Sequence, residues 1–357
     1  MQVFNIEVYD SNLNCIYYDN IDRVSYEFDY LSMKENKITI DLNEIITKGN
    51  YIRITNDIYN YFGVITTIDK SENQMVIGYK PFTFLFASNC IFDTSKQGTS
   101  QVLETYIKQQ IENNYKNNSD TLQNIAILGT ITTTSSTTNW GFNIKSDKEG
   151  MNRALISLYD VLLTRAFNKY GIVVNVIPDF ANRVVNLEIG KVDTSDLYIE
   201  AELPNILSKN IVIRDANDDL NKAVMVNTTN YSQTINYYLH PDRTYNTTNS
   251  NRITPVVSEY VGVDIEEGKT FSQCAEEQAT NTFGTIEYSN LIELEVLNDD
   301  TLVKPLEIQI GQKVNVLYKG VIYPSILSGF NRDLTTLLTF GSIRLDLTKL
   351  IKTGGII

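Results

Sequence analysis

Histidine, cysteine and tryptophan are scarce in this sequence of 357 residues, which contains one histidine, three cysteines and one tryptophan. With His240 as the single histidine, no site can use two imidazoles, and Ser-His catalysis would depend on this residue alone. His240 precedes a proline in YLHPD, a setting typical of a structural or solvated histidine. Cys15, Cys90 and Cys274 are far apart and odd in number, so they predict neither a disulfide framework nor a zinc cluster. We therefore expect no metal and no cofactor, and synthesis in a reducing compartment.

Long apolar runs are also missing. No apolar stretch approaches the ~20 residues of a membrane-spanning helix. Met1 is followed at once by a strand pattern, QVFNIEVYD, without the basic and apolar regions of a leader peptide. We expect a protein that is made in the cytosol and has no membrane-spanning segment.

Basic residues are outnumbered by acidic ones, 30 against 43, which gives a formal net charge of −13. Such a balance argues against a surface built to grip nucleic-acid phosphates. It is compatible with an acidic passage through which DNA slides without binding specifically.

The motifs that carry chemistry are incomplete. The segment from Asp215 to Asp219 resembles the start of a calcium loop, but Leu220 and Val226 stand where that loop needs Gly and Glu. Acidic groups such as Asp264-Ile-Glu266-Glu267 and Asp299-Asp300 are common in β turns, although paired carboxylates also serve glycoside hydrolysis. The sequence has no Gly-rich phosphate loop. We therefore predict that the chain is not an enzyme and has no catalytic residues.

Strand patterns dominate what is present. From Met1 to about Phe92, short runs of branched and aromatic residues are separated by Asp, Asn, Gly and Lys, as in an antiparallel sandwich or barrel. From about Leu197 the strands return, with a single helix opened by Thr270-x-x-Gln273 and ended at Gly284. The fold class is therefore mainly β with an α+β insertion.

The insertion, residues 95–193, contains two predicted helices and two strands. Thr99 or Ser100 can cap the first helix, whose apolar positions are Leu103, Tyr106, Ile107 and Ile111. A capping box, Ser146-x-x-Glu149, predicts the start of the second helix, which ends at Gly171 in a left-handed stop. Its predicted buried face is Leu155, Leu158, Val161 and Leu162. We predict three domains: 1–94, 95–193 and 194–357.

One hairpin pattern occurs twice. The segment KVNVLYKGVIYPSILSGF begins at Lys313, 262 positions after YIRITNDIYNYFGVITTI begins at Tyr51. Both segments alternate apolar and polar residues, turn at polar residues, and alternate again, which indicates a hairpin with one buried face. A duplicated β domain and two ordinary antiparallel hairpins both explain this pattern.

The closing segment, IQIGQKVNVLYKGVIYPSILSGFNRDLTTLLTFGSIRLDLTKLI, resembles the final domain of phage tail hub proteins. The features that resemble this family are Gly311 before a strand, the Tyr-Lys-Gly hairpin, the return strand into Ser-Gly, and the strand Phe-Gly-Ser-Ile-Arg-Leu. The family includes the N-terminal part of siphophage tail-associated lysins, the baseplate hub of contractile tails and the base of the type VI secretion spike.

The resemblance implies two similar tube-forming β domains that flank the α/β insertion, and association into a homotrimer. Three chains with two such domains each would match a hexameric tail tube, which would explain why the hairpin occurs twice. The implied function is a structural hub that closes the end of the tail tube and forms the channel for DNA ejection. The chain would be assembled in the host cytoplasm and lie in the virion, at the tail tip or baseplate. Its implied partners are a distal tail protein and a tape measure protein or tail tube protein.

Side chains on the repeated hairpins would face two ways. The apolar positions Ile52, Ile54, Val314 and Val316 would face the core. Arg53, Thr55 and Asn315 then point to the opposite face, as candidate tube-facing or lumen-facing residues, with an ordinary solvent-facing role equally open.

Two alternatives remain at this point. A β-rich adhesin or carbohydrate-binding protein would use tyrosine-rich surfaces and Trp140 as stacking platforms. A glycan hydrolase would use paired carboxylates. Any peptidoglycan-cutting activity of longer tail-associated lysins is not expected here, because the sequence stops at Gly354-Gly-Ile-Ile357.

Overall fold

The computed structural model describes residues 3–342, except 23, 25, 57–58, 94–100, 139, 141–152, 193–195, 214–219, 241–243, 266–267, 284–287 and 289. The chain divides into two compact units. Unit 1 comprises Met1–Ser195, Leu297–Gln312 and Gly329–Leu337, and unit 2 comprises Asp196–Val296, Lys313–Ser328 and Leu338–Ile357. The predicted boundary at residues 94 and 95 falls inside unit 1, and the three-domain division stays a prediction.

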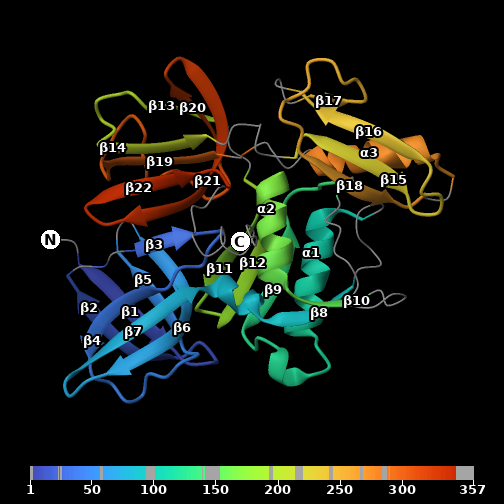
Figure 1. Cartoon of the computed structure of the whole chain (residues 1–357). Coiled ribbons are helices and arrows are strands. Elements are labelled where there is room, and N and C mark those ends of the chain that lie inside the picture. Colours follow the sequence, from blue (N-terminus) through green and yellow to red (C-terminus); the bar gives the residue numbers. More distant parts are fainter. Residues whose placement is uncertain are drawn as a thin grey trace. The chain divides into compact units, whose positions relative to one another are not determined.

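Unit 1 begins with a six-stranded antiparallel sheet in the order β2-β1-β5-β6-β7-β4 (Figure 1). Its strands are β1 (Phe4–Tyr9), β2 (Cys15–Ile21), β4 (Asn36–Asp41), β5 (Tyr51–Thr55), β6 (Asn60–Lys70) and β7 (Gln74–Pro81). Alternate residues are buried, as in β4, where Asn36, Ile38 and Ile40 point inward and Lys37, Thr39 and Asp41 outward. The mainly β prediction is therefore confirmed, and the period-two patterns mark the strands of this sheet.

The rest of unit 1 mixes helices and short sheets. A 3₁₀ helix, η1 (Phe82–Ala87), leads into β8 (Asn89–Asp93), which pairs antiparallel with β10 (Arg153–Ser157). A three-stranded sheet has the order β11-β12-β9, formed by β9 (Leu128–Thr133), β11 (Ile172–Asp179) and β12 (Val184–Lys191). The helices are α1 (Leu103–Ile111), the π-helical turns η2 (Glu112–Lys116) and η4 (Tyr159–Leu163), the 3₁₀ turn η3 (Thr121–Gln123), and α2 (Thr164–Tyr170).

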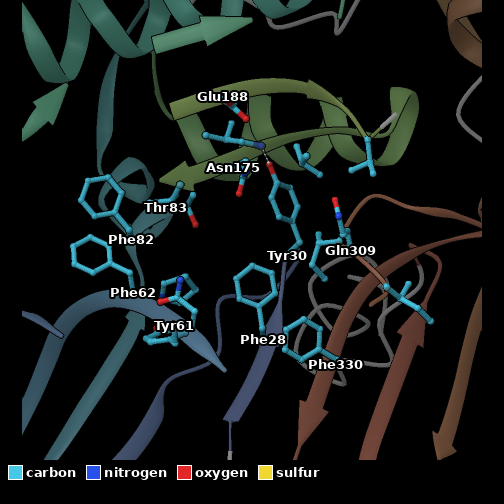
Figure 2. A pocket seen from close by; sticks show the side chains of 18 of the residues that line it. Phe28, Tyr30, Tyr61, Phe62, Phe82, Thr83, Asn175, Glu188, Gln309 and Phe330 are labelled. Atoms are coloured by element: carbon cyan, nitrogen blue, oxygen red, sulfur yellow. Dashed lines mark hydrogen bonds between the residues drawn. The ribbon is translucent and has the colours of Figure 1, made fainter. Parts of the chain in front are cut away.

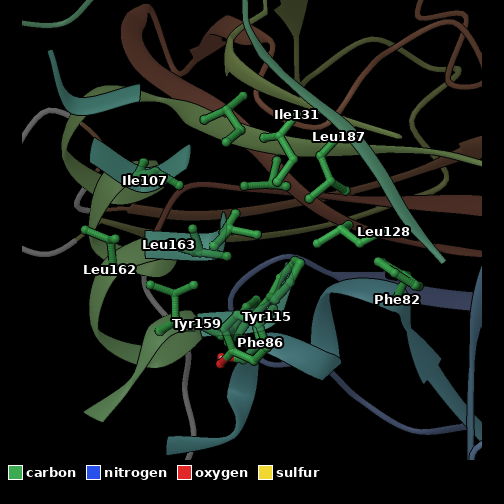
Figure 3. Close-up of a cluster of buried hydrophobic side chains, with 14 of the residues drawn as sticks. Phe82, Phe86, Ile107, Tyr115, Leu128, Ile131, Tyr159, Leu162, Leu163 and Leu187 are labelled. Carbon is green, nitrogen blue, oxygen red and sulfur yellow. The ribbon is translucent and has the colours of Figure 1, made fainter. Parts of the chain in front are cut away.

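One apolar cluster joins these helices and sheets. Figure 3 shows Ile107 from α1, Leu162 and Leu163 from η4, and Ile131 and Leu187 from the three-stranded sheet packed together. The cluster also includes Tyr9, Tyr51 and Val64 of the six-stranded sheet. Burying a side chain of this size contributes about 1.5–3 kcal/mol. The cluster therefore holds the insertion to the first sheet as one unit.

Two predicted helix starts differ from the structure. Helix α1 begins at Leu103, with Val102 as its N-cap and no side-chain cap bond, while Thr99 and Ser100 lie outside the described residues. The Ser146-x-x-Glu149 box also lies outside them. The helix predicted from it is wrong at Leu155, which lies on strand β10 and is 58% exposed. Pairing of β10 with β8, distant in sequence, overrides the local helical spacing.

The ends of two helices follow local signals. Gly171 adopts a left-handed conformation, with φ of 68°, and its N–H donates to Phe167 O at 2.8 Å, as predicted for a glycine stop. Helix α3 (Phe271–Phe283) begins with the predicted capping box. The Thr270 N–H donates to Gln273 Oε1 at 2.8 Å, and the Gln273 N–H donates to Thr270 Oγ1 at 3.4 Å. Gly284 lies outside the described residues.

Unit 2 contains most of a second large sheet, in the order β13-β20-β21-β22-β19-β14. Its strands are β13 (Leu197–Glu200), β14 (Ser208–Ile213), β19 (Asn290–Leu297), β20 (Lys313–Tyr318), β21 (Val321–Arg332) and β22 (Thr335–Phe340). The last residues of β21, Gly329–Arg332, belong to unit 1, where they pair antiparallel with β3 (Tyr26–Asp29).

A four-stranded sheet and α3 complete unit 2. The sheet has the order β17-β16-β15-β18, formed by β15 (Lys222–Asn227), β16 (Thr234–Leu239), β17 (Tyr245–Asn246) and β18 (Ser258–Val263). Helix α3 packs on it through Cys274, Ala275, Ala279 and Phe283, which join Ala223 and Met225 in one cluster. Among the described residues, none of the helices has both the length and the apolar composition of a membrane-spanning helix.

Candidate functional site

The two repeated hairpins have the same strand register. Tyr51 lies opposite Val64 in β5 and β6, and Lys313 lies opposite Ile326 in β20 and β21, with both positions shifted by 262 residues. The pair Ile54 and Tyr61 corresponds in the same way to Val316 and Tyr323. A shift of one residue would send every side chain to the other face of the sheet. The ungapped sequence match therefore extends to the hydrogen-bonded pairing of the strands.

The likeness extends from the hairpins to their sheets. In the first sheet the order β1-β5-β6-β7-β4 occupies five adjacent positions, and in the second β13-β20-β21-β22-β19 occupies the matching five. Beyond these five strands, the first sheet has β2 next to β1, and the second has β14 next to β19 and β3 paired with the end of β21. One pairing differs, because β1 is antiparallel to β5 whereas β13 is parallel to β20. The sheets share a five-strand order and differ at their edges.

The core positions predicted on both hairpins are buried. Ile52, Ile54, Val314 and Val316 are each at most 3% exposed. On the opposite face, Arg53, Thr55 and Asn315 are half-buried. Their predicted place on a tube or lumen surface stays a prediction.

Arg53 is held within unit 1 by two contacts. Its Nη1 atom donates to Glu7 Oε2 at 3.0 Å, and its guanidinium carbon lies 4.6 Å from the ring centroid of Phe180. Glu7 lies directly opposite Arg53 on the neighbouring strand β1. Arg53 therefore already has an acidic and an aromatic partner in one chain.

The described residues that were considered for catalysis or metal binding form hydrogen bonds within loops and turns. The ring nitrogens of His240 lie 3.3 Å from Asn251 O and 3.1 Å from Asn246 Oδ1. Asp300 Oδ1 accepts hydrogen bonds from the N–H groups of Leu302 and Val303, as a turn-capping aspartate does. Asp215–Asp219 and Glu266-Glu267 lie in parts of the chain that are not described. Among the described residues, no group of three or more His, Cys, Asp or Glu side chains could hold a metal ion.

The adhesin alternative requires Trp140 at the surface, as a stacking platform, and the structure contradicts this. Its side chain is 1% exposed, and its Nε1 donates to Gln101 O at 2.6 Å. It packs on Tyr106 with ring centroids 4.8 Å apart. Trp140 is a core residue and not a stacking platform for a sugar ring.

Unit 1 contains a cavity of about 770 Å³. Figure 2 shows Phe28, Phe62, Phe82, Tyr30 and Phe330 around it, with Asn175 pointing into the open space. These side chains come from segments distant in sequence: β3 with the turn residue after it, β6, η1, β11 and the part of β21 that belongs to unit 1. The volume lies within the ~300–1,000 Å³ that is usual for ligand pockets.

Arg332 also lines this cavity and is 8% exposed. Its Nη2 donates to Pro305 O at 3.2 Å, and its guanidinium carbon lies 3.8 Å from the centroid of the Phe330 ring. Burial lowers the pKa of Arg332, while the nearby phenols of Tyr26 and Tyr59 oppose this shift. Burial also raises the pKa of Tyr26 far above its usual value, so this phenol stays neutral. The groups that act on Arg332, a carbonyl, an aromatic ring and two phenols, are therefore all uncharged.

Neither the cavity nor the burial of Arg332 is predicted by the sequence. The arginine follows the repeated hairpin directly, in Phe330-Asn-Arg332-Asp333, but no local spacing distinguishes it from a surface residue. Its burial depends on β3 pairing with the end of β21, a contact between segments about 300 residues apart.

No family model matches this sequence. No curated protein matches it either. Solved structures do match it along nearly the whole chain. The tail protein of Neisseria meningitidis MC58 has a TM-score of 0.56 at 10% identity, with 95% of this chain and 96% of that chain covered.

Two further solved structures match this chain over a similar length. The 43 kDa tail protein of prophage MuSo2 from Shewanella oneidensis has a TM-score of 0.53 at 11% identity, with 95% of this chain and 98% of that chain covered. A chain in a topological model of the p2 virion baseplate in its activated conformation has a TM-score of 0.50 at 11% identity, with coverage of 96% and 100%. The resemblance predicted from the closing segment is confirmed: this chain has the fold of phage tail and baseplate proteins.

Proposed function

We propose that this chain is a structural, non-enzymatic hub of a phage tail tip or baseplate, which closes the tail tube as a homotrimer and forms the channel for DNA ejection. The observation that carries the proposal is the common register of the two hairpins, 262 residues apart, inside two sheets with the same five-strand order. The fold shared with solved tail proteins supports it.

The symmetry of a tail tube and the edges of the two sheets both favour this assembly. A homotrimer of a chain with two similar sheets presents six similar sheets, which fits a tube of sixfold symmetry. Each sheet has edge strands, and unpaired edges expose N–H and C=O groups that another chain can pair with. A closed ring of subunits would cover such edges.

The proposed partners follow from this position. A distal tail protein would bind one side of the hub, and a tape measure protein or tail tube protein the other. In the virion the hub would lie at the tail tip or baseplate. DNA would pass through it without specific binding, which the net charge of −13 favours because an acidic wall repels phosphates. Arg53, Thr55 and Asn315 are the proposed tube-facing or lumen-facing residues.

The experiment that tests this proposal is the mass of the purified chain by light scattering, alone and after mixing with a tail tube or distal tail protein, with negative-stain images of the same fractions. A trimeric ring with a central opening and a pseudo-sixfold outline is the expected result. A chain that stays monomeric under both conditions, and binds a glycan array instead, would replace the hub with the adhesin alternative.

A further inference from the structure

We propose that the cavity of unit 1 binds a carboxylate carried on an apolar body, with Arg332 as the anion-binding residue. The site is built within one chain, so the inference does not depend on the proposed tail function. Four features of unit 1 support it: the charge of Arg332, the aromatic wall of the cavity, its polar side and the free edge of β11.

The guanidinium charge of Arg332 is the first of these features. Arg332 forms no ion pair with any carboxylate in the described part of the chain, although it is almost fully buried. The Pro305 carbonyl and the Phe330 ring attract the guanidinium but carry no negative charge. Buried charges in proteins are normally paired, and a carboxylate matches the planar guanidinium with two parallel hydrogen bonds. A carboxylate that enters the cavity would supply the missing charge.

Aromatic side chains form a large part of the cavity wall. Phe28, Phe62, Phe82 and Tyr30 surround the space in Figure 2, so a carboxylate without an apolar body would leave this surface uncovered. Aromatic walls with a few placed polar groups are the usual construction of a ligand pocket. The ligand therefore has an apolar or aromatic body.

The cavity also has a polar side. Glu188 and Asn175 lie there together, on the two neighbouring strands β12 and β11 (Figure 2). Glu188 is acidic and would repel the carboxylate of a ligand. Of the two cationic side chains that line the cavity, Lys191 is exposed to solvent and Arg332 is buried, so Arg332 gains more from a carboxylate partner. The carboxylate of Glu188 instead accepts N–H groups, such as those of an amide.

Strand β11 lies at the edge of its three-stranded sheet. No strand among the described residues pairs with the side of β11 that faces away from β12. The Val174 N–H on this side donates to the Tyr30 hydroxyl at 3.0 Å. Alternation along the strand places the N–H of Val176 on the same side. A carboxylate can come from a small organic acid or from an acidic residue of a polypeptide, and only the polypeptide could also pair with this edge.

The test is calorimetric titration of the full chain with 4-phenylbutanoate and with its neutral counterpart, 4-phenylbutanamide. We expect one acid to bind per chain, at least about tenfold more tightly than the amide, because a charge-assisted hydrogen bond replaces a neutral one. Equal affinities for acid and amide, or no binding of the acid at millimolar concentrations, would overturn the proposal.

Two variants localise the binding. Arg332→Gln should remove the preference for the acid over the amide, whereas Arg252→Gln, at an exposed arginine of unit 2, should keep it. Asn175→Trp places a large ring in the cavity from an exposed position and should weaken both ligands at least tenfold. Its control is Asn73→Trp, at an exposed turn residue between β6 and β7. Should Arg332→Gln fail to fold, the Asn175→Trp comparison decides alone, and unchanged binding in that variant contradicts the proposal.

A second pair of ligands distinguishes the two sources of the carboxylate. The blocked peptide acetyl-Phe-Glu-Phe-amide, compared with its Gln counterpart, offers the same acid together with backbone groups. Tighter binding of this peptide than of 4-phenylbutanoate would identify an acidic polypeptide segment as the ligand, and weaker binding would identify a small acid.

Discussion

The carboxylate of Glu104 accepts two hydrogen bonds from Thr137, one from the backbone N–H at 2.7 Å and one from Oγ1 at 2.9 Å. Ser135 Oγ donates a third at 2.6 Å. Glu104 lies in the first turn of α1 and is 0% exposed, so it fastens the Thr/Ser-rich segment to this helix. Burial alone would raise its pKa, but these hydrogen bonds to the ionised form outweigh burial and lower it.

Glu104→Gln is expected to lower the free energy of unfolding by about 1–3 kcal/mol at pH 7, because a buried hydrogen-bonded charge is lost. Since the pKa of Glu104 is lowered in the folded state, the wild type keeps this stabilisation above the unfolded pKa, about 4.3. It loses the stabilisation as the pH falls through the folded pKa, so the two proteins should converge in acid. Urea unfolding at several pH values measures this, with Glu112→Gln, at a more exposed position, as control. A constant difference between the two proteins down to the lowest pH would contradict the assignment.

Val316→Asp should prevent folding or lower stability by more than about 3 kcal/mol, because Val316 is fully buried and the new carboxylate has no partner. Ile54→Asp, at the corresponding position of the first sheet, should have the same effect. Asn315→Asp, on the opposite face of β20, is the control and should remain soluble. The measurement is the soluble fraction followed by denaturant unfolding. A well-folded Val316→Asp protein would remove this residue from the core.

Arg53→Met should lower stability by about 1–2 kcal/mol, since it removes a partly buried ion pair and a cation–π contact. A double-mutant cycle with Glu7→Gln should show coupling of about 0.5–1 kcal/mol between the two side chains. Thermal unfolding of the four proteins measures this coupling. If the coupling is zero, the ion pair does not hold Arg53 in place, and the side chain is free for another role.

Lys169→Met should flatten the pH dependence of stability above neutral pH. Burial, with a smaller contribution from Arg165, lowers the pKa of Lys169 to about 8. The unfolded chain, with a lysine pKa of about 10.4, then binds more protons than the folded one between these values, so wild-type stability rises from pH 8 towards pH 10. Denaturant unfolding at pH 7.5 and 9.5 checks this rise. Lys37→Met, at an exposed position of β4, should retain it.

Local signals predicted much of the fold. Period-two alternation marked the repeated hairpins, and glycine or capping chemistry marked the end of α2 at Gly171 and the start of α3 at Thr270. The helix predicted from Ser146 is wrong at Leu155, because Leu155 pairs with Ile91 and that pairing depends on distant sequence.

Of the candidate sites, the hairpin positions could be predicted from the sequence and the cavity could not. Buried positions on the hairpins could be predicted, since the strand period alone separates Ile52 and Ile54 from Arg53. The cavity could not, because its walls come from segments that only the tertiary fold brings together, and the burial of Arg332 depends on β3. Local pattern predicts which side of a strand is buried, but not which distant segment covers it.

The division of the chain between its two units has a consequence for its synthesis. Unit 1 needs residues 297–312 and 329–337, which follow most of unit 2 in the sequence. A ribosome therefore completes the last part of unit 1 only after it has translated most of unit 2. No single uninterrupted gene fragment encodes unit 1 alone, so a fragment ending near residue 195 lacks Arg332 and the strand end that pairs with β3.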